Sequence, residues 1–181
     1  MDLPLGLYYQ NDFLSPELEQ EIVSYLDKQP WSTKLTRRTQ HYGYEYDYKS
    51  RKAPLSATPI SGPLRTVADH LAKYEVLNPT QCIVNEYTQK QGISAHSDSN
   101  IFGPVIVSIS LLAPCEMIFT KDTEEKRITL LPRSALIMTN EARSLWKHEI
   151  RSTLKVPLPD KSTYIKPADY RRISLTFRTL R

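Results

Sequence analysis

The sequence has few cysteines and no long apolar run. Only Cys82 and Cys115 occur among 181 residues, and both stand in apolar, strand-like surroundings, which indicates reduced core thiols rather than a disulfide framework. No stretch approaches the roughly 18 apolar residues that a membrane helix needs. The acidic first 25 residues lack the basic and apolar regions of a signal peptide. These absences predict a protein of the reducing cell interior, cytoplasmic or nuclear, with no membrane partner.

Length and charge limit the organisation of the chain. A length of 181 residues is typical of one compact domain, so we expect a single domain over residues 1–181. The formal net charge is +4 and the pI is near 9.0, which is compatible with a polyanionic partner but does not by itself indicate one. The position of the positive charge is therefore more informative than its total.

The order of local patterns predicts helices first and strands after them. Ser15, followed by Pro16 and three glutamates, is typical of a helix start, and apolar residues at helical spacing predict a second helix over about residues 61–74. From Gln81 onward, runs rich in Val, Ile, Thr and aromatic residues predict strands near 81–88, 105–113, 115–120, 126–131, 134–139 and 171–179. We interpret residues 155–169 as a long surface loop. The expected fold class is α+β, with a small antiparallel barrel or jelly roll and two N-terminal helices packed outside it.

Two histidines and one aspartate form a candidate metal site. His96 and Asp98 are separated by one residue, so an extended chain places both side chains on the same side and points Ser97 away. His148 would supply a third ligand from another strand. Two imidazoles and one carboxylate are the facial ligand set of non-haem Fe(II) oxygenases. The alternative is that His96 and Asp98 belong to a surface turn and His148 is a structural histidine.

A second candidate site lies near the carboxyl end, where polar residues alternate with apolar ones. Alternation over residues 172–178 places Arg172, Ser174 and Arg178 on one face of a predicted strand. Arginine suits the binding of a small dianion, because its planar fork donates two parallel hydrogen bonds to a carboxylate and keeps its charge. Asn85 and Tyr87 share one face of another predicted strand and could add neutral hydrogen bonds. The alternative is an amphipathic edge strand with solvated arginines.

Positive charge is concentrated in residues 34–52, together with tyrosines at alternate positions. Basic residues that track phosphates, combined with aromatic rings that stack on bases, are typical of sites for single-stranded or flipped-out nucleotides. The alternative is that the tyrosines pack on the barrel and the charges form a solvated rim. The candidate substrate-binding residues are Arg37, Arg38, His41, Tyr42, Tyr44, Tyr46 and Arg51.

Four ordered motifs give the chain a resemblance to a known family. Asn85-Glu86-Tyr87, Gly92-Ile93 just before His96-Ser97-Asp98, Trp146-Lys147-His148, and the stretch from Arg172 to Arg178 follow one another at compatible spacings. Together they resemble the AlkB family of Fe(II)- and 2-oxoglutarate-dependent dioxygenases over about residues 37–181. The resemblance implies a double-stranded β-helix, or jelly-roll, core with a nucleotide-recognition lid formed by the basic, tyrosine-rich segment.

The resemblance also implies roles for the site residues. His96, Asp98 and His148 would be the catalytic residues that hold Fe(II), while 2-oxoglutarate and dioxygen would complete the reacting groups. Arg172 would pair with the remote carboxylate of 2-oxoglutarate, helped by Tyr87 and Ser174, whereas Asn85 and Arg178 would lie nearer its chelating end. Ser174 departs from the family pattern, because several members carry asparagine there.

The resemblance implies oxidation of a nucleobase substituent as the reaction. The segment that begins at Arg37, together with the Trp146-Lys147-His148 motif, is most similar to the branch that hydroxylates a modified wobble uridine in tRNA. The expected partner is therefore RNA, tRNA included, or single-stranded DNA, and hydroxylation and oxidative demethylation both stay open, as does a separate targeting subunit. Two other hypotheses remain, namely a protein side-chain hydroxylase or demethylase with the same chemistry and a non-catalytic nucleic-acid-binding module.

Overall fold

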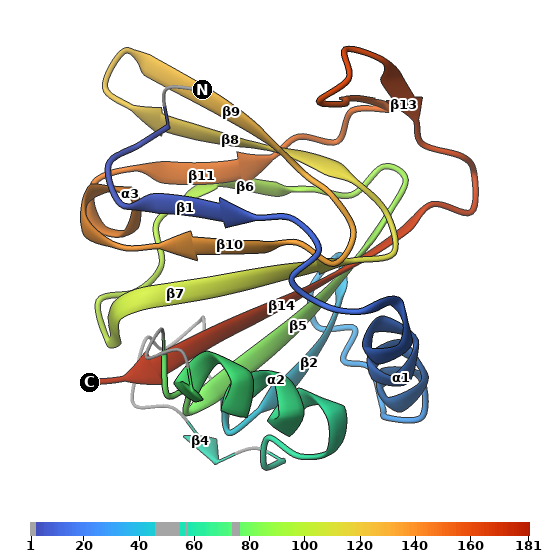
Figure 1. Ribbon diagram of the computed structural model, residues 1–181, viewed down its shortest axis with the longest axis vertical. Coiled ribbons are helices and arrows are strands. Elements are labelled where there is room, and N and C mark those ends of the chain that lie inside the picture. The colour runs from blue at the N-terminus through green and yellow to red at the C-terminus, as the bar shows by residue number, and fades with distance from the viewer. Residues whose placement is uncertain (1–2, 46–54, 57, 74–76) are drawn as a thin grey trace.

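Two antiparallel sheets and two outer helices form the protein. The computed structural model describes residues 3–45, 55–56, 58–73 and 77–181. In Figure 1 the smaller sheet lies at the top, and the helices lie below, beside the larger sheet. Within the described residues, no helix is both long enough and apolar enough to cross a membrane.

The larger sheet has six strands, and its centre carries most of the candidate site. Its order is β1 (Leu7–Gln10), β10 (Ala135–Met138), β7 (Phe102–Leu111), β14 (Arg171–Leu180), β5 (Gln81–Thr88) and β2 (Arg38–Tyr42). β14 pairs with β5 on one side and with β7 on the other, with Ser174 opposite both Asn85 and Ser110. Strands distant in the sequence are therefore neighbours at the centre of the sheet.

The smaller sheet supplies the remaining candidate residues. Its order is β6 (Ile93–His96), β11 (Lys147–Ile150), β8 (Cys115–Lys121) and β9 (Glu124–Leu130). A short helix, α3 (Asn140–Ser144), connects β10 of the larger sheet to β11 of the smaller one. Two additional strand pairs lie outside these sheets: β3 (Tyr44–Glu45) with β4 (Leu55–Ser56), and β12 (Lys155–Pro157) with β13 (Thr163–Ile165).

The helices cover the outer face of the larger sheet. α1 (Pro16–Asp27) begins after Ser15, whose Oγ accepts a hydrogen bond from the backbone N–H of Leu18 at 3.1 Å. α2 (Gly62–Lys73) follows the predicted apolar spacing. Their buried residues belong to one core cluster with alternate residues of β5, β7 and β14, namely Ile22, Leu26, Leu64, Val67, Leu71, Val84, Ile109, Ile173 and Leu175. The opposite face of the sheet is thus left to a second core cluster and the candidate site.

The predicted fold class is confirmed, and the remaining differences are local. Strands occur at all six predicted positions, and helices occur at both predicted positions. The prediction of a long loop over residues 155–169 was wrong, because β12 and β13 pair there around a turn. No ranges were predicted for the short strands β1, β2, β6 and β11, which have four or five residues each, although His96 was expected on an extended segment and His148 on a strand.

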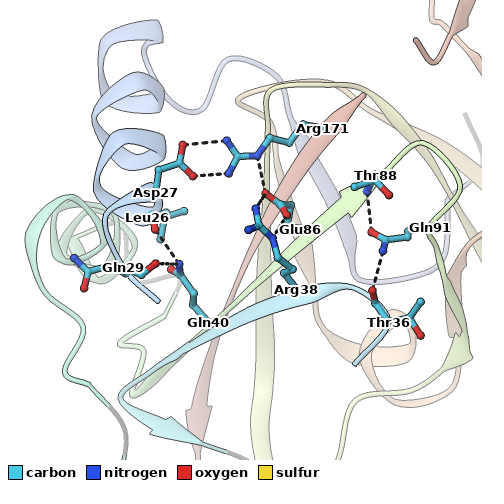
Figure 2. Close-up of polar contacts among 10 residues, drawn as sticks. All are labelled: Leu26, Asp27, Gln29, Thr36, Arg38, Gln40, Glu86, Thr88, Gln91 and Arg171. Carbon is cyan, nitrogen blue, oxygen red and sulfur yellow. Dashed lines mark hydrogen bonds and ion pairs between the residues drawn. The ribbon is translucent and has the colours of Figure 1, made fainter. Parts of the chain in front are cut away.

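A network of charged side chains joins α1 to the larger sheet (Figure 2). The Glu86 carboxylate on β5 accepts hydrogen bonds from Nε and Nη2 of Arg38 at 2.6 and 2.8 Å, and from Nε of Arg171 at 2.7 Å. Arg171 also donates from Nη1 to Asp27 on α1 at 3.0 Å. Burial alone would raise the pKa of Glu86, but the two arginines outweigh it and hold this pKa below its ordinary value. Glu86 therefore stays charged and connects three strands with a helix.

We predict that Glu86→Gln lowers the free energy of unfolding by about 2 kcal/mol at pH 7, because it removes charge-assisted hydrogen bonds from a buried acceptor. The folded-state pKa is depressed, so the stabilisation is complete above the unfolded pKa. It is lost as the pH falls from the ordinary value of 4.5 through the lower folded-state pKa. Urea unfolding of both proteins between pH 7 and pH 2 measures this difference.

The matched control is Glu125→Gln, because Glu125 is an exposed carboxylate paired with Arg127 and Arg151. This control should change stability much less, since solvent screens exposed ion pairs. An equal loss in both variants, or a Glu86→Gln effect that does not change with pH, would contradict the prediction.

Candidate active site

A pocket of about 600 Å³ lies between the two sheets and collects most of the candidate residues. Its walls come from β5, β7 and β14 of the larger sheet and from β6, β8 and β11 of the smaller one. The lining residues include Arg37, Asn85, Tyr87, His96, Asp98, Phe102, Met117, His148, Ser174 and Arg178. Most residues of both candidate sites therefore line one cavity, whereas the fully buried Arg172 is not part of its lining.

His96, Asp98 and His148 lie together at the edge of the smaller sheet. His96 on β6 is the direct cross-strand partner of His148 on β11, and their ring centroids are 4.4 Å apart. Asp98 follows β6, and its Oδ2 lies 3.7 Å from Nε2 of His148. The antiparallel register thus brings the distant histidine to the His-x-Asp motif.

The electrostatic surroundings keep Asp98 and His148 in the forms that bind a metal. Burial would raise the pKa of Asp98, but nearby cations, Arg178 first among them, hold it below its usual range. Arg178 donates from Nη1 to Oδ1 of Asp98 at 2.7 Å, and Oδ2 faces His148. Burial lowers the pKa of His148 to about 4. At neutral pH the site therefore contains a carboxylate and a neutral imidazole on β11, as metal coordination requires.

Arg172 is fully buried at the centre of the larger sheet, and only part of its guanidinium forms hydrogen bonds. Its Nη2 donates to Ser110 Oγ at 2.8 Å, and its guanidinium lies 5.3 Å from the centroid of the Tyr87 ring. Its Nε and Nη1 are buried and have no hydrogen-bond partner within the described part of the chain. These unpaired donors favour an anionic ligand such as a carboxylate.

The other predicted cosubstrate contacts share the face of Arg172. Asn85 and Tyr87 on β5, and Ser174 on β14, are buried and line the pocket. Ser174 forms a hydrogen bond of 3.1 Å with Ser108 on β7. Asn85 Oδ1 accepts from Nε of Arg37 at 2.7 Å, so a basic side chain next to β2 also reaches this face.

The predicted substrate-binding residues are divided between the two faces of the larger sheet. Arg37 lines the pocket, and the half-buried His41 lies on the pocket-facing side of β2. Arg38 and Tyr42 have the opposite orientation: Arg38 pairs with Glu86, and Tyr42 is 3% exposed within the core beneath the helices. The prediction that these two residues face the substrate was therefore wrong.

The tyrosines at alternate positions do not share one face at the start of their segment. Gly43 separates Tyr42 from Tyr44 and has a φ of +82°, which interrupts the extended alternation. Tyr44 on β3 is 39% exposed, whereas Tyr42 is buried. Tyr46 and Arg51, the remaining residues predicted to bind substrate, lie outside the described residues.

Sequence reasoning missed two residues that contact Arg178, namely Gln81 and Phe102, of which Phe102 lines the pocket. Gln81 accepts from Nε of Arg178 at 2.9 Å, and its alternate spacing from Asn85 on a predicted strand could have indicated it. The Arg178 guanidinium lies over the ring of Phe102, 3.9 Å from the ring centroid. No pattern in the sequence indicates Phe102, because its position depends on a chain reversal after Asp98.

The residues present fit both a metal ion and an α-keto acid. Among the described residues, no three His, Cys, Asp or Glu side chains already stand at coordinating geometry. The fold nevertheless brings two imidazoles and one carboxylate together beside an arginine-lined pocket. This donor set suits Fe(II), and the open nitrogens of Arg172 suit the second carboxylate of a dianion.

Comparisons with known proteins place this site in context. Residues 28–178 match the 2OG-Fe(II) oxygenase superfamily. The chain is 31% identical over 205 residues to the "Alkylated DNA repair protein ALKBH8 homolog" of Arabidopsis thaliana, covering 97% of this chain and 58% of the relative. It is 33% identical over 166 residues to the "tRNA (carboxymethyluridine(34)-5-O)-methyltransferase alkbh8" of Xenopus tropicalis, covering 82% of this chain and 25% of the relative. The chain thus spans only part of the length of these two proteins.

Comparison with solved structures supports the fold assignment. The structure of OsALKBH1 superposes with a TM-score of 0.72 over 99% of this chain and 100% of that chain, at 18% identity. The match to the superfamily begins at Lys28, directly after α1, extends to Arg178 and includes His96, Asp98, His148 and Arg172. The chain therefore belongs to the 2OG-Fe(II) oxygenase superfamily, with AlkB homologues among its relatives.

Proposed function

We propose that this protein is a dioxygenase that oxidises a substituent of a nucleobase in RNA or single-stranded DNA, with a modified tRNA uridine as the leading substrate. The observation that carries the proposal is one pocket that joins His96, Asp98 and His148 to the inward-facing arginines. In this proposal the trio holds Fe(II), which supplies oxidation of a C–H bond when it is bound with 2-oxoglutarate and dioxygen.

The surrounding residues orient the reacting groups. Arg178 fixes Oδ1 of Asp98 and leaves Oδ2 directed toward His148. Arg172 receives the remote carboxylate of 2-oxoglutarate on its open nitrogens, with Tyr87 packed against the guanidinium. Because Arg172 is fully buried, this contact is shielded from water, and a charge-assisted hydrogen bond there is strong.

Support for a nucleic-acid substrate comes from the pocket lining and from the relatives. Arg37 places a guanidinium among the lining residues, and Tyr44 is exposed on the short strand that follows β2. The relatives' names refer to alkylated DNA repair and to a carboxymethyluridine of tRNA. A basic group and an aromatic ring are the chemistry that holds a phosphate and stacks on a base.

Anaerobic titration of the Fe(II)-loaded protein with 2-oxoglutarate tests the proposed chemistry. We expect a metal-to-ligand charge-transfer band and, after oxygen is admitted, succinate formation that pooled unmodified and modified tRNA stimulates. Asp98→Ala should abolish both the band and turnover, because the variant loses a ligand and leaves the Arg178 charge unpaired.

The outcomes separate the alternatives. A band without stimulation by tRNA or by alkylated single-stranded DNA would contradict the nucleic-acid substrate and favour a protein side chain. Oligonucleotide binding without succinate from any substrate would favour a non-catalytic module. A band that persists in Asp98→Ala would contradict the assigned ligand set.

Arg172→Ala should raise the KM for 2-oxoglutarate by about 30-fold or more, because losing one partner of a buried charge pair costs several kcal/mol. Its kcat at saturating 2-oxoglutarate should fall much less. Arg172→Lys, which keeps the charge but not the fork, should give an intermediate KM. Steady-state succinate formation measures both constants. An unchanged KM in the alanine variant would contradict the role of Arg172.

Arg37→Gln should raise the Kd for the oligonucleotide about tenfold and reduce the dependence of binding on salt, because it removes one phosphate-compatible cation from the pocket lining. The matched control is Lys155→Gln, which removes the same charge from exposed β12. Fluorescence anisotropy at several salt concentrations separates the two. Equal effects of both substitutions would indicate a general charge effect and contradict a specific contact by Arg37.

A further inference from the structure

Arg143 is a buried cation that the proposed reaction does not use directly. It lies on α3, is 7% exposed, and is absent from the residues that line the pocket. Burial lowers its pKa from the ordinary value, with the negative charge of Asp98 acting in the opposite direction. A guanidinium remains charged even so, and a buried charge needs compensating partners.

The partners of Arg143 all lie in one segment, residues 98–103, which consists of the loop after β6 and the first two residues of β7. Nη2 donates to the carbonyl oxygen of Ser99 at 2.8 Å and to that of Phe102 at 3.4 Å. Nη1 donates to the carbonyl oxygen of Asp98 at 3.1 Å, and Nε to that of Gly103 at 3.3 Å. One side chain thus holds four carbonyls of residues 98–103, the segment that leads from Asp98 into β7.

This segment contains two groups that set the position of the Asp98 carboxylate. The carbonyl oxygen of Asp98 accepts a hydrogen bond from Arg143. The ring of Phe102 lies beneath the guanidinium of Arg178, and its centroid is 3.9 Å away. Arg178 in turn donates to Oδ1 of Asp98. Movement of the segment would therefore displace both the carboxylate and the arginine that orients it.

Arg143 also belongs to the segment that carries the third proposed ligand. α3 ends at Ser144, and β11 with His148 begins three residues later. Within this connection, the carbonyl oxygen of Trp146 accepts from Ser97 Oγ at 3.4 Å. Arg143 consequently joins the part of the chain that presents His148 to the part that presents Asp98.

We infer that Arg143 is a positioning residue for the metal site, which fixes the 98–103 segment so that Asp98 and His148 face the same metal ion. The inference rests on the proposed function, since it takes these two residues as ligands. The planar fork of arginine can reach several carbonyls at once, which a single ammonium cannot do with the same geometry. Groups that orient metal ligands typically contribute 10- to 100-fold to metal affinity.

Mn(II) binding to the full chain in the presence of 2-oxoglutarate tests this role without turnover. Electron paramagnetic resonance of free Mn(II) gives the affinity of the wild type, Arg143→Gln and Arg143→Lys. We expect about 10- to 100-fold weaker binding in Arg143→Gln. Arg143→Lys should keep at least about a fivefold loss, because it restores the charge without the fork. Hydrogen exchange of residues 98–103 should be faster in both variants.

The matched control is Arg133→Gln, because Arg133 pairs with Asp12 and Glu19 away from the pocket. It should lower the Tm without changing Mn(II) affinity. Equal weakening of Mn(II) binding in this control would attribute the effect to lost stability and overturn the inference.

Two further results would also overturn it: wild-type affinity in Arg143→Lys, or affinities within twofold of wild type in both Arg143 variants. If Arg143→Gln does not fold, the lysine variant alone decides between these results. Failure of the wild type to bind Mn(II), or full binding in His96→Ala, would instead contradict the proposed metal site. The failure of the proposed function is thus distinguishable from the failure of the inference.

Discussion

Polar and apolar side chains alternate along β14, which lies between two other central strands. This alternation is the constraint on which the rest of the structure depends. Ile173 and Leu175 pack into the core beneath the helices, whereas Arg172 and Ser174 point to the opposite side. The long ladders of β14 with β5 and β7 fix which side chains point to each side over most of the strand. A slip of one residue would place guanidiniums among apolar side chains and isoleucine in the pocket. The register that forms the core therefore also determines which side chains face the reaction.

Three buried arginines around the site have different kinds of partner, and the difference separates their roles. Arg178 pairs with the Asp98 carboxylate, so its charge is compensated within the chain. Arg143 donates to four carbonyl oxygens and is engaged at all three of its nitrogens. Arg172 donates to one serine, while two of its nitrogens have no partner in the described chain. Because an unsatisfied buried donor is costly, the open nitrogens favour an anionic ligand at Arg172.

Sequence patterns predicted the faces of side chains best where alternation continues over eight or more residues. β5 and β14 meet this condition, and Asn85, Arg172 and Arg178 were recognised on the correct faces. Alternation did not place the tyrosines correctly, because Gly43 adopts a positive φ and interrupts the extended chain. Arg143 could not be recognised, since its acceptors are backbone carbonyls that leave no residue pattern. Side chains whose positions follow from strand alternation can thus be identified from the sequence. Side chains whose partners are distant backbone carbonyls cannot.

The basic composition overstates the charge available to a nucleic acid, because many arginines are already paired. Arg38 and Arg171 share Glu86 on the helical side of the larger sheet, while Arg127 and Arg151 share Glu125 on the smaller one. These four guanidiniums stabilise the scaffold, and a phosphate would have to compete with carboxylates for them. In contrast, Arg37 donates to the neutral amide of Asn85 and lines the pocket. The adjacent residues Arg37 and Arg38 therefore have different surroundings, the pocket for Arg37 and the Glu86 ion pair for Arg38, and net charge alone cannot distinguish the two.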